Sequence, residues 1–61
     1  MLPEDMLKEL YKELNNYGIG SLTIWEEDFI ENLYEKIIIN EFNMTEKQEM
    51  KIENIYNKAI G

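Results

Sequence analysis

Four carboxylates in the middle of the chain are the residues whose types and spacing could do chemistry: Glu27, Asp28, Glu31 and Glu35. At about 100° per residue they share one arc of a helix and form an acidic ridge. Paired carboxylates can act as general acid and base, but catalysis needs a walled pocket to separate their pKa values. A chain of 61 residues has little interior for a pocket. Calcium would also need loop carbonyls at a spacing that is missing here. We therefore predict no catalytic site, no metal site and no cofactor.

The acidic ridge has two interpretations. The simpler one is a solvated outer face of a helix, opposite to its apolar stripe. The functional one is a surface that imitates the phosphate spacing of DNA, or that meets a basic partner by electrostatic steering. Most of the formal net charge of −7 falls between Thr23 and Phe42, so the ridge carries most of the excess.

Three lysines form the basic patch of the sequence. Lys47, Lys51 and Lys58 lie at positions i, i+4 and i+11, so they share one stripe of the last predicted helix. Phosphate contact is physically possible there, but three lysines on a chain of net charge −7 give a field that about 0.1 M salt largely screens. An exposed face with local Glu–Lys pairs is the simpler interpretation. We expect direct nucleic-acid binding to be weak or absent.

The composition excludes the commonest enzyme chemistries. The chain has no Cys and no His, and Ser21 is its one serine, so thiolate, imidazole and serine-triad catalysis lack their groups. Apolar residues make up 44% and charged residues 31%, which is typical of a folded domain. No apolar run approaches the ~20 residues of a membrane span, and Glu4 and Asp5 do not suit a signal peptide. We expect a cytoplasmic protein with no membrane contact and no enzymatic activity.

Three amphipathic segments position these groups, and they predict a compact all-α domain over residues 1–61 with helices at 3–16, 23–42 and 45–60. Pro3 suits a first helical position, and Gly18 suits the left-handed conformation that ends a helix. Thr23 with Glu26, and Thr45 with Gln48, match the capping box that begins a helix. We expect the helical hairpin 23–60 to form the core.

Apolar stripes indicate which residues face that core. In the middle segment the stripe is Trp25, Phe29, Leu33 and Ile37, widened by Ile30 and Tyr34. In the last segment it is Ile52, Ile55, Tyr56, Ala59 and Ile60.

Apolar residues off these stripes are candidates for contact with another molecule. Ile37, Ile38 and Ile39 are consecutive, so at least one of them must point away from the core. We predict that a protein partner binds at Ile38, Ile39, Phe42 and Met44. Packing by the first helix and the loops, or pairing of two copies in a homodimer, are the alternatives.

The predicted hairpin contains two motifs. The first is Trp25-Glu26-x-x-Phe29-Ile30, and the second is Thr45-Glu46-Lys47-Gln48 followed by Ile52-x-x-Ile55-Tyr56-x-Lys58. Together they resemble a small helical module of phage and bacterial proteins of DNA replication, recombination and repair. That module usually extends a larger chain and carries no catalytic residues, whereas here it follows a helix of its own.

The resemblance and the absence of catalytic groups lead to one functional hypothesis. We expect a non-catalytic acidic interaction module, of phage or bacterial type, that binds a protein of the DNA replication, recombination or repair machinery. The alternative is an acidic DNA mimic whose ridge occupies the nucleic-acid site of a host protein.

Overall fold

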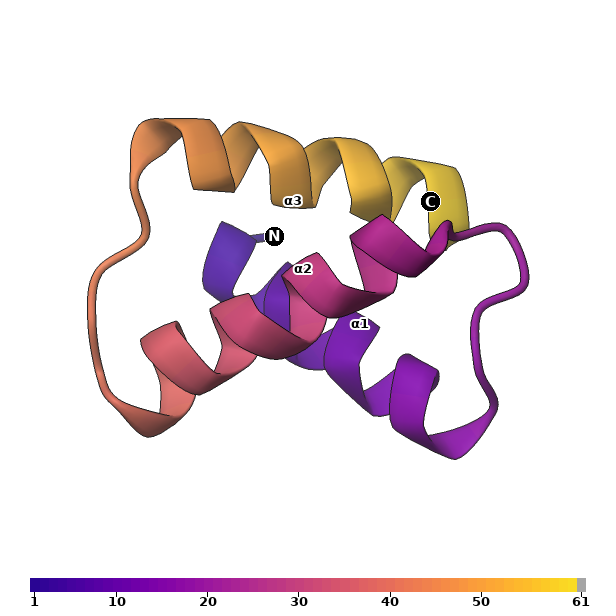
Figure 1. Cartoon of the computed structure of the whole chain (residues 1–61). Helices are drawn as coiled ribbons and strands as arrows, with labels where there is room; N and C mark the ends of the chain where they lie inside the picture. The colour runs from indigo at the N-terminus through magenta and orange to yellow at the C-terminus, as the bar shows by residue number, and fades with distance from the viewer. Residues whose placement is uncertain (61) are drawn as a thin grey trace.

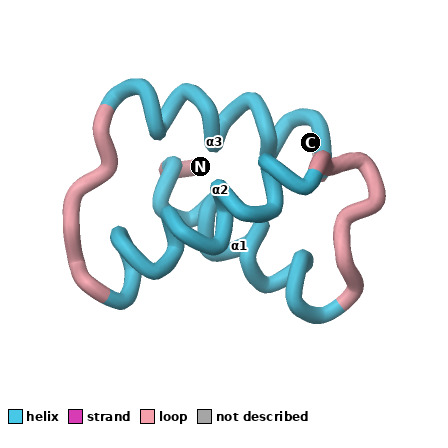
Figure 2. Tube along the Cα trace, viewed as in Figure 1, coloured by secondary structure: helices cyan, strands magenta, loops and turns pink. Residues whose placement is uncertain are grey.

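The computed structural model describes residues 1–60, which form three helical segments. In chain order these are α1 (Pro3–Asn16), α2 (Ile24–Tyr34) with its direct continuation, the π turn η1 (Glu35–Ile39), and α3 (Glu46–Ala59). Figure 2 shows the two loops that connect them. The described residues contain no strand, and the predicted all-α three-helix fold is confirmed.

Helix α1 holds the other two helices together. Backbone contacts between separate helices are concentrated between α1 and α2 and between α1 and α3. Figure 1 shows α2 beginning beside the carboxyl end of α3, after which the two helices diverge toward the loop 40–45. The expectation that the hairpin 23–60 forms the core is therefore correct only in part: the hairpin supplies five of the seven buried apolar residues, but α1 is the central packing element.

The core consists of seven buried apolar residues drawn from all the helical segments: Leu7, Leu10, Ile30, Leu33, Ile37, Ile52 and Ile55. Leu7 and Leu10 are completely buried and three residues apart, so they lie on the same face of α1. This face meets both α2 and α3, which is why α1 has the central place.

Local hydrogen bonds begin and end the helices as the sequence predicts. The Thr23 hydroxyl accepts from the Glu26 amide at 3.1 Å, and the Glu26 carboxylate accepts from the Thr23 amide at 2.9 Å. Thr45 and Gln48 make the same reciprocal pair at 3.2 and 2.9 Å. After α1, Gly18 has a φ of 75°, where a side chain would be strained. Both capping boxes and the predicted role of Gly18 are confirmed.

The π turn resolves the problem of three consecutive isoleucines. The Asn40 amide donates to the Glu35 carbonyl at 2.9 Å, five residues back, so the chain rotates less per residue here than in an α-helix. Ile37 is buried and Ile38 packs against the core, while Ile39 is 63% exposed. One isoleucine thus points outward, as expected. The helical segment ends at Ile39, three residues before the predicted end, and Glu41 follows with a φ of 60°.

The middle helix is rotated relative to the predicted stripe. Trp25, expected in the core, is 59% exposed, whereas Glu26 is only 7% exposed. Positions 26, 30, 33 and 37 form the inward face, which is a stripe of helical spacing that differs from the predicted one by a small rotation. Ile60, expected in the last stripe, is also exposed.

Candidate functional site

An open groove lies along α2 on the side that faces α3. It has a volume of about 250 Å³ and is lined by Trp25, Asp28, Phe29, Asn32, Leu33, Lys36 and Gln48. Six of these residues come from α2 and η1, and Gln48 comes from the first turn of α3. The groove exists because α2 and α3 diverge, which leaves side chains between them only partly covered.

Two stacked aromatic rings form the apolar part of this α2–α3 groove. The ring centroids of Trp25 and Phe29 are 5.3 Å apart, with an angle of 11° between their planes. The Nζ atom of Lys51 on α3 lies 4.9 Å from the centroid of a Trp25 ring, a cation–π contact. Trp25 is held from two sides and still presents more than half of its surface to solvent, so it is a rigid apolar anchor for a partner.

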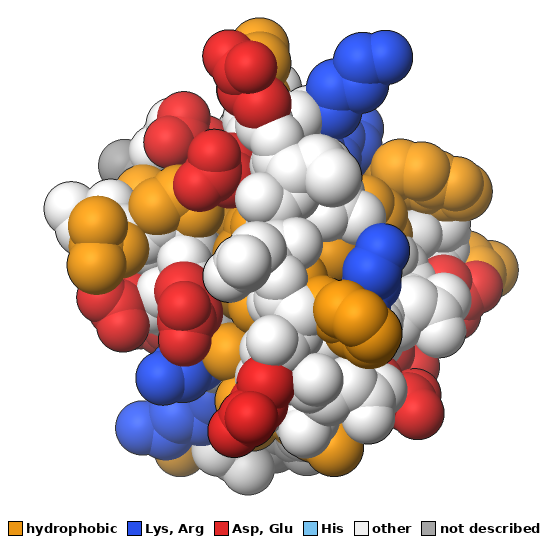
Figure 3. Space-filling model, turned by 90° about the vertical axis from the view of Figure 1, so that its left-hand side faces the viewer, with side chains coloured by type: hydrophobic (Ala, Val, Ile, Leu, Met, Phe, Trp, Pro, Cys, Tyr) orange, Lys and Arg blue, Asp and Glu red, His pale blue; other side chains and the backbone are white. Residues whose placement is uncertain are grey.

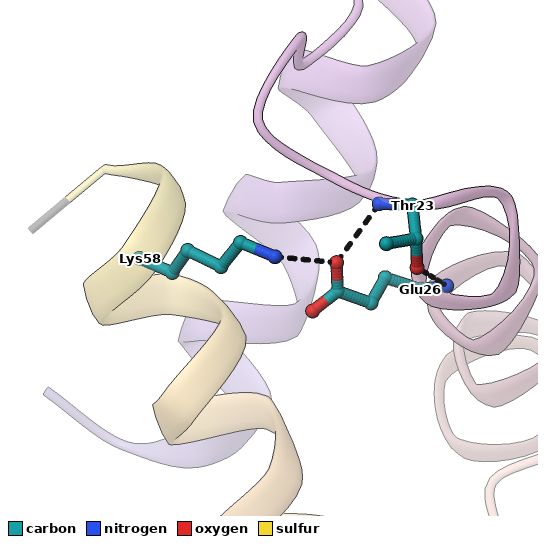
Figure 4. Close-up of polar contacts among 3 residues, drawn as sticks. All are labelled: Thr23, Glu26 and Lys58. Carbon is teal, nitrogen blue, oxygen red and sulfur yellow. Dashed lines mark hydrogen bonds and ion pairs between the residues drawn. The ribbon is translucent and has the colours of Figure 1, made fainter.

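A partly buried ion pair joins α2 to α3 near the end of the groove where α2 begins. The Nζ atom of Lys58 donates to Oε1 of Glu26 at 2.8 Å, and the same oxygen accepts from the Thr23 amide (Figure 4). The hydrogen bond from Lys58, followed by that from Thr23, holds the pKa of Glu26 below its ordinary value. Glu26 therefore caps α2 and joins it to the last turn of α3.

A second polar contact joins α3 to α1. The Tyr56 hydroxyl donates to Oε2 of Glu9 at 3.4 Å. Burial, followed by the negative charge of Glu9, raises the pKa of Tyr56 above its ordinary value. Tyr56 and Lys58, both from the motif that carries the resemblance, thus make contacts between helices.

The predicted acidic ridge lies next to the α2–α3 groove. Asp28 lines the groove itself, while Glu31 and Glu35 lie three and seven residues further on, on the outer face of the same helical segment, and all three are exposed. Glu27 is half-buried. The ion pairs found within residues 1–60 join Lys8 to Glu4 and Lys58 to Glu26, so the ridge carboxylates keep their charges unpaired there.

The predicted partner-binding residues gather around the loop 40–45 but do not form one apolar patch. Ile39 and Phe42 are exposed, whereas Ile38 and Met44 pack against the core. Figure 3 looks at this end of the molecule and shows apolar side chains in separate groups among acidic, basic and uncharged ones. A shallow hollow of about 240 Å³ lies between the start of α1 and this loop, with Phe42 and Met44 among its lining residues.

The three lysines of the predicted basic stripe have different surroundings. Lys47 is exposed on the first turn of α3, whereas Lys51 contacts Trp25 and Lys58 is paired with Glu26. Two of the three side chains therefore have acceptors within the chain itself. Phosphate contact by Lys47, Lys51 and Lys58 stays a prediction.

The described part of the chain contains no cluster of three or more metal-ligating side chains of Asp, Glu, His or Cys. Between Met1 and Ile60, no helix combines the length and apolar character that crossing a bilayer requires. The expected lack of metal, cofactor and enzymatic activity stays a prediction.

The α2–α3 groove was not predicted from the sequence, because the predicted apolar stripe places Trp25 and Phe29 in the core. One signal could have found it. Glu26, Ile30, Leu33 and Ile37 also have the spacing of a helical stripe, and a glutamate in that stripe indicates a buried acid that needs a partner such as Lys58.

Comparison of the chain with protein-family models, with curated proteins and with solved structures found no match. The resemblance to a replication and recombination module therefore stays a prediction.

Proposed function

We propose that this chain is a non-catalytic interaction module that binds a protein partner through the α2–α3 groove. The observation that carries the proposal is Trp25, a large side chain held in place by Phe29 and Lys51 and yet 59% exposed at an open apolar groove. Aromatic residues fixed in this way are the commonest anchors of protein interfaces. The surface around Ile39 and Phe42 would be an additional contact region.

The partner class in this proposal comes from the resemblance. We propose a component of the DNA replication, recombination or repair machinery of a phage or bacterium, and hence action in the cytoplasm. The net charge of −7 supports a protein rather than a nucleic acid as the direct target, because phosphates would be repelled.

Capture from a bacterial lysate by the immobilised chain, followed by mass spectrometry, tests this function. The expected result is a replication, recombination or repair protein whose capture is lost with Trp25→Asp. The control is Tyr17→Asp, which changes an exposed aromatic residue outside the groove lining and should leave capture intact. Capture that is equal for the two variants would contradict the role of the groove. A captured set without any protein of this class would contradict the proposed partner.

A DNA mimic is the second candidate function, and the acidic ridge favours it, because its carboxylates have no ion pair within residues 1–60. Residues four apart on a helix are separated by about 6 Å along its axis, so the ridge is a row of negative charges, as is one DNA strand with its phosphates about 3.4 Å apart along the axis. A mimic would compete with DNA for the captured protein. Charge reversal with Asp28→Lys, Glu31→Lys and Glu35→Lys should then abolish the competition, and unchanged competition would exclude mimicry.

A further inference from the structure

The shape of the α2–α3 groove restricts what can occupy it. The groove extends along α2 and η1 from Trp25 to Lys36, an interval of 11 residue steps, or about 16 Å at about 1.5 Å per residue. Its floor is apolar, formed by Trp25, Phe29 and Leu33. Two diverging helices with an apolar floor between them match the groove into which an amphipathic helix lays its apolar face.

The two edges of the groove carry opposite charge. On the α2 side lie Asp28 and, outside it, Glu31 and Glu35, all exposed and without ion pairs within residues 1–60. On the α3 side lies Lys51, with Lys47 one turn before it. Lys36 is a positive side chain on the α2 side of the groove. A helix in the groove would therefore place basic side chains along α2 and apolar ones on the floor.

A second copy of this chain does not satisfy that pattern. Each copy carries a net charge of −7, and the repulsion between two acidic ridges opposes a dimer through this surface. A basic partner has the complementary charge.

We propose that the α2–α3 groove binds a basic amphipathic helix of about three turns, whose apolar face contacts Trp25 and Phe29 and whose basic flank pairs with Asp28, Glu31 and Glu35. This inference rests on the proposed function, because it names the partner segment for the same groove. The acidic ridge sets the specificity and the aromatic pair supplies the apolar contact.

Titration of synthetic helices into the purified chain tests the inference, with the fluorescence of the single tryptophan, Trp25, as the readout. The first peptide has about 14 residues, with leucines at helical spacing and lysines beside them. The second replaces each lysine with glutamate. The third has the composition of the first in an order that scatters the leucines over all faces. The first peptide should give a saturable change in emission. Its affinity should exceed that of each of the other two peptides by about tenfold or more.

Charge variants separate the ridge from the overall charge. The affinity for the first peptide should fall by about tenfold or more in the triple variant Asp28→Asn, Glu31→Gln and Glu35→Gln. The matched control is the triple variant Asp5→Asn, Glu13→Gln and Glu53→Gln. It also removes one aspartate and two glutamates, but away from the ridge, and should lower the affinity much less. Circular dichroism would establish that both variants fold.

Several outcomes would overturn the inference. A basic amphipathic helix would be excluded if the glutamate peptide or the scattered peptide bound as tightly as the first peptide. It would also be excluded if the two triple variants had equal effects, or if no peptide bound saturably. Sedimentation that shows a dimer dissociated by Trp25→Asp would assign the groove to a second copy instead. Partner capture that requires Trp25 but survives the ridge variant would leave the proposed function standing while this inference fails.

Discussion

Replacement of Leu10 by alanine is expected to remove a large part of the stability of this domain. Leu10 is completely buried on the face of α1 that meets both other helices. Truncating a buried leucine costs about 2–5 kcal/mol, because the apolar contacts are lost and a cavity remains. At about 0.05–0.15 kcal/mol per residue, a chain of 61 residues has a free energy of unfolding of about 3–9 kcal/mol. We therefore expect Leu10→Ala to lose about half or more of this free energy and to unfold at a much lower urea concentration than the unchanged chain.

Urea denaturation followed by circular dichroism at 25 °C measures this effect. The matched control is Leu2→Ala, the same truncation at a side chain that is 68% exposed, where a change within about 0.5 kcal/mol is expected. Ile52→Ala on α3 should lose a free energy similar to that of Leu10→Ala, because both side chains belong to one core. A loss below about 1 kcal/mol for Leu10→Ala, with full unfolding of Ile52→Ala, would refute the central role of α1.

Two further predictions concern Glu26 and the two residues of positive φ. Because Lys58 and Thr23 lower the pKa of Glu26 in the folded state, the ionised group stabilises the fold above the unfolded value near 4.5, and this stabilisation is lost as the pH falls through the folded pKa. Thermal melting should show Glu26→Gln less stable at pH 7 and the difference closing in acid; a constant difference would contradict the pairing. Glu41→Gly should stabilise the chain by about 0.5–1 kcal/mol and Gly18→Ala should destabilise it by a similar amount, since only glycine adopts positive φ without strain. Urea denaturation measures both, and equal signs would exclude this explanation.

Local chemistry made the helix boundaries predictable. Thr23 with Glu26, and Thr45 with Gln48, each satisfy amides that the first turn of a helix leaves unpaired, so their spacing alone indicates where α2 and α3 begin. The end of the middle helical segment was harder to predict from the sequence. The π turn depends on how Ile37 and Ile38 pack against the rest of the core, and periodicity along the chain does not contain that information.

The groove depended on features that sequence spacing does not specify. The predicted and observed stripes of the middle segment share Ile30, Leu33 and Ile37 and differ by a small rotation, and the packing of α1 decides which one faces inward. The angle between α2 and α3 is likewise a property of the assembled core. The helical period alone is enough to place the ridge carboxylates on one arc. The pairing of Lys58 with Glu26, in contrast, joins residues 32 positions apart and depends on how the helices pack.

The ion pair at one end of the groove has a geometric consequence for its occupant. Glu26 and Lys58 fix the distance between α2 and α3 at that end, while the loop 40–45 joins them at the other. Any change in the crossing of the two helices must then pivot about the fixed end, so the width available to a ligand varies least near Trp25 and most near Lys36.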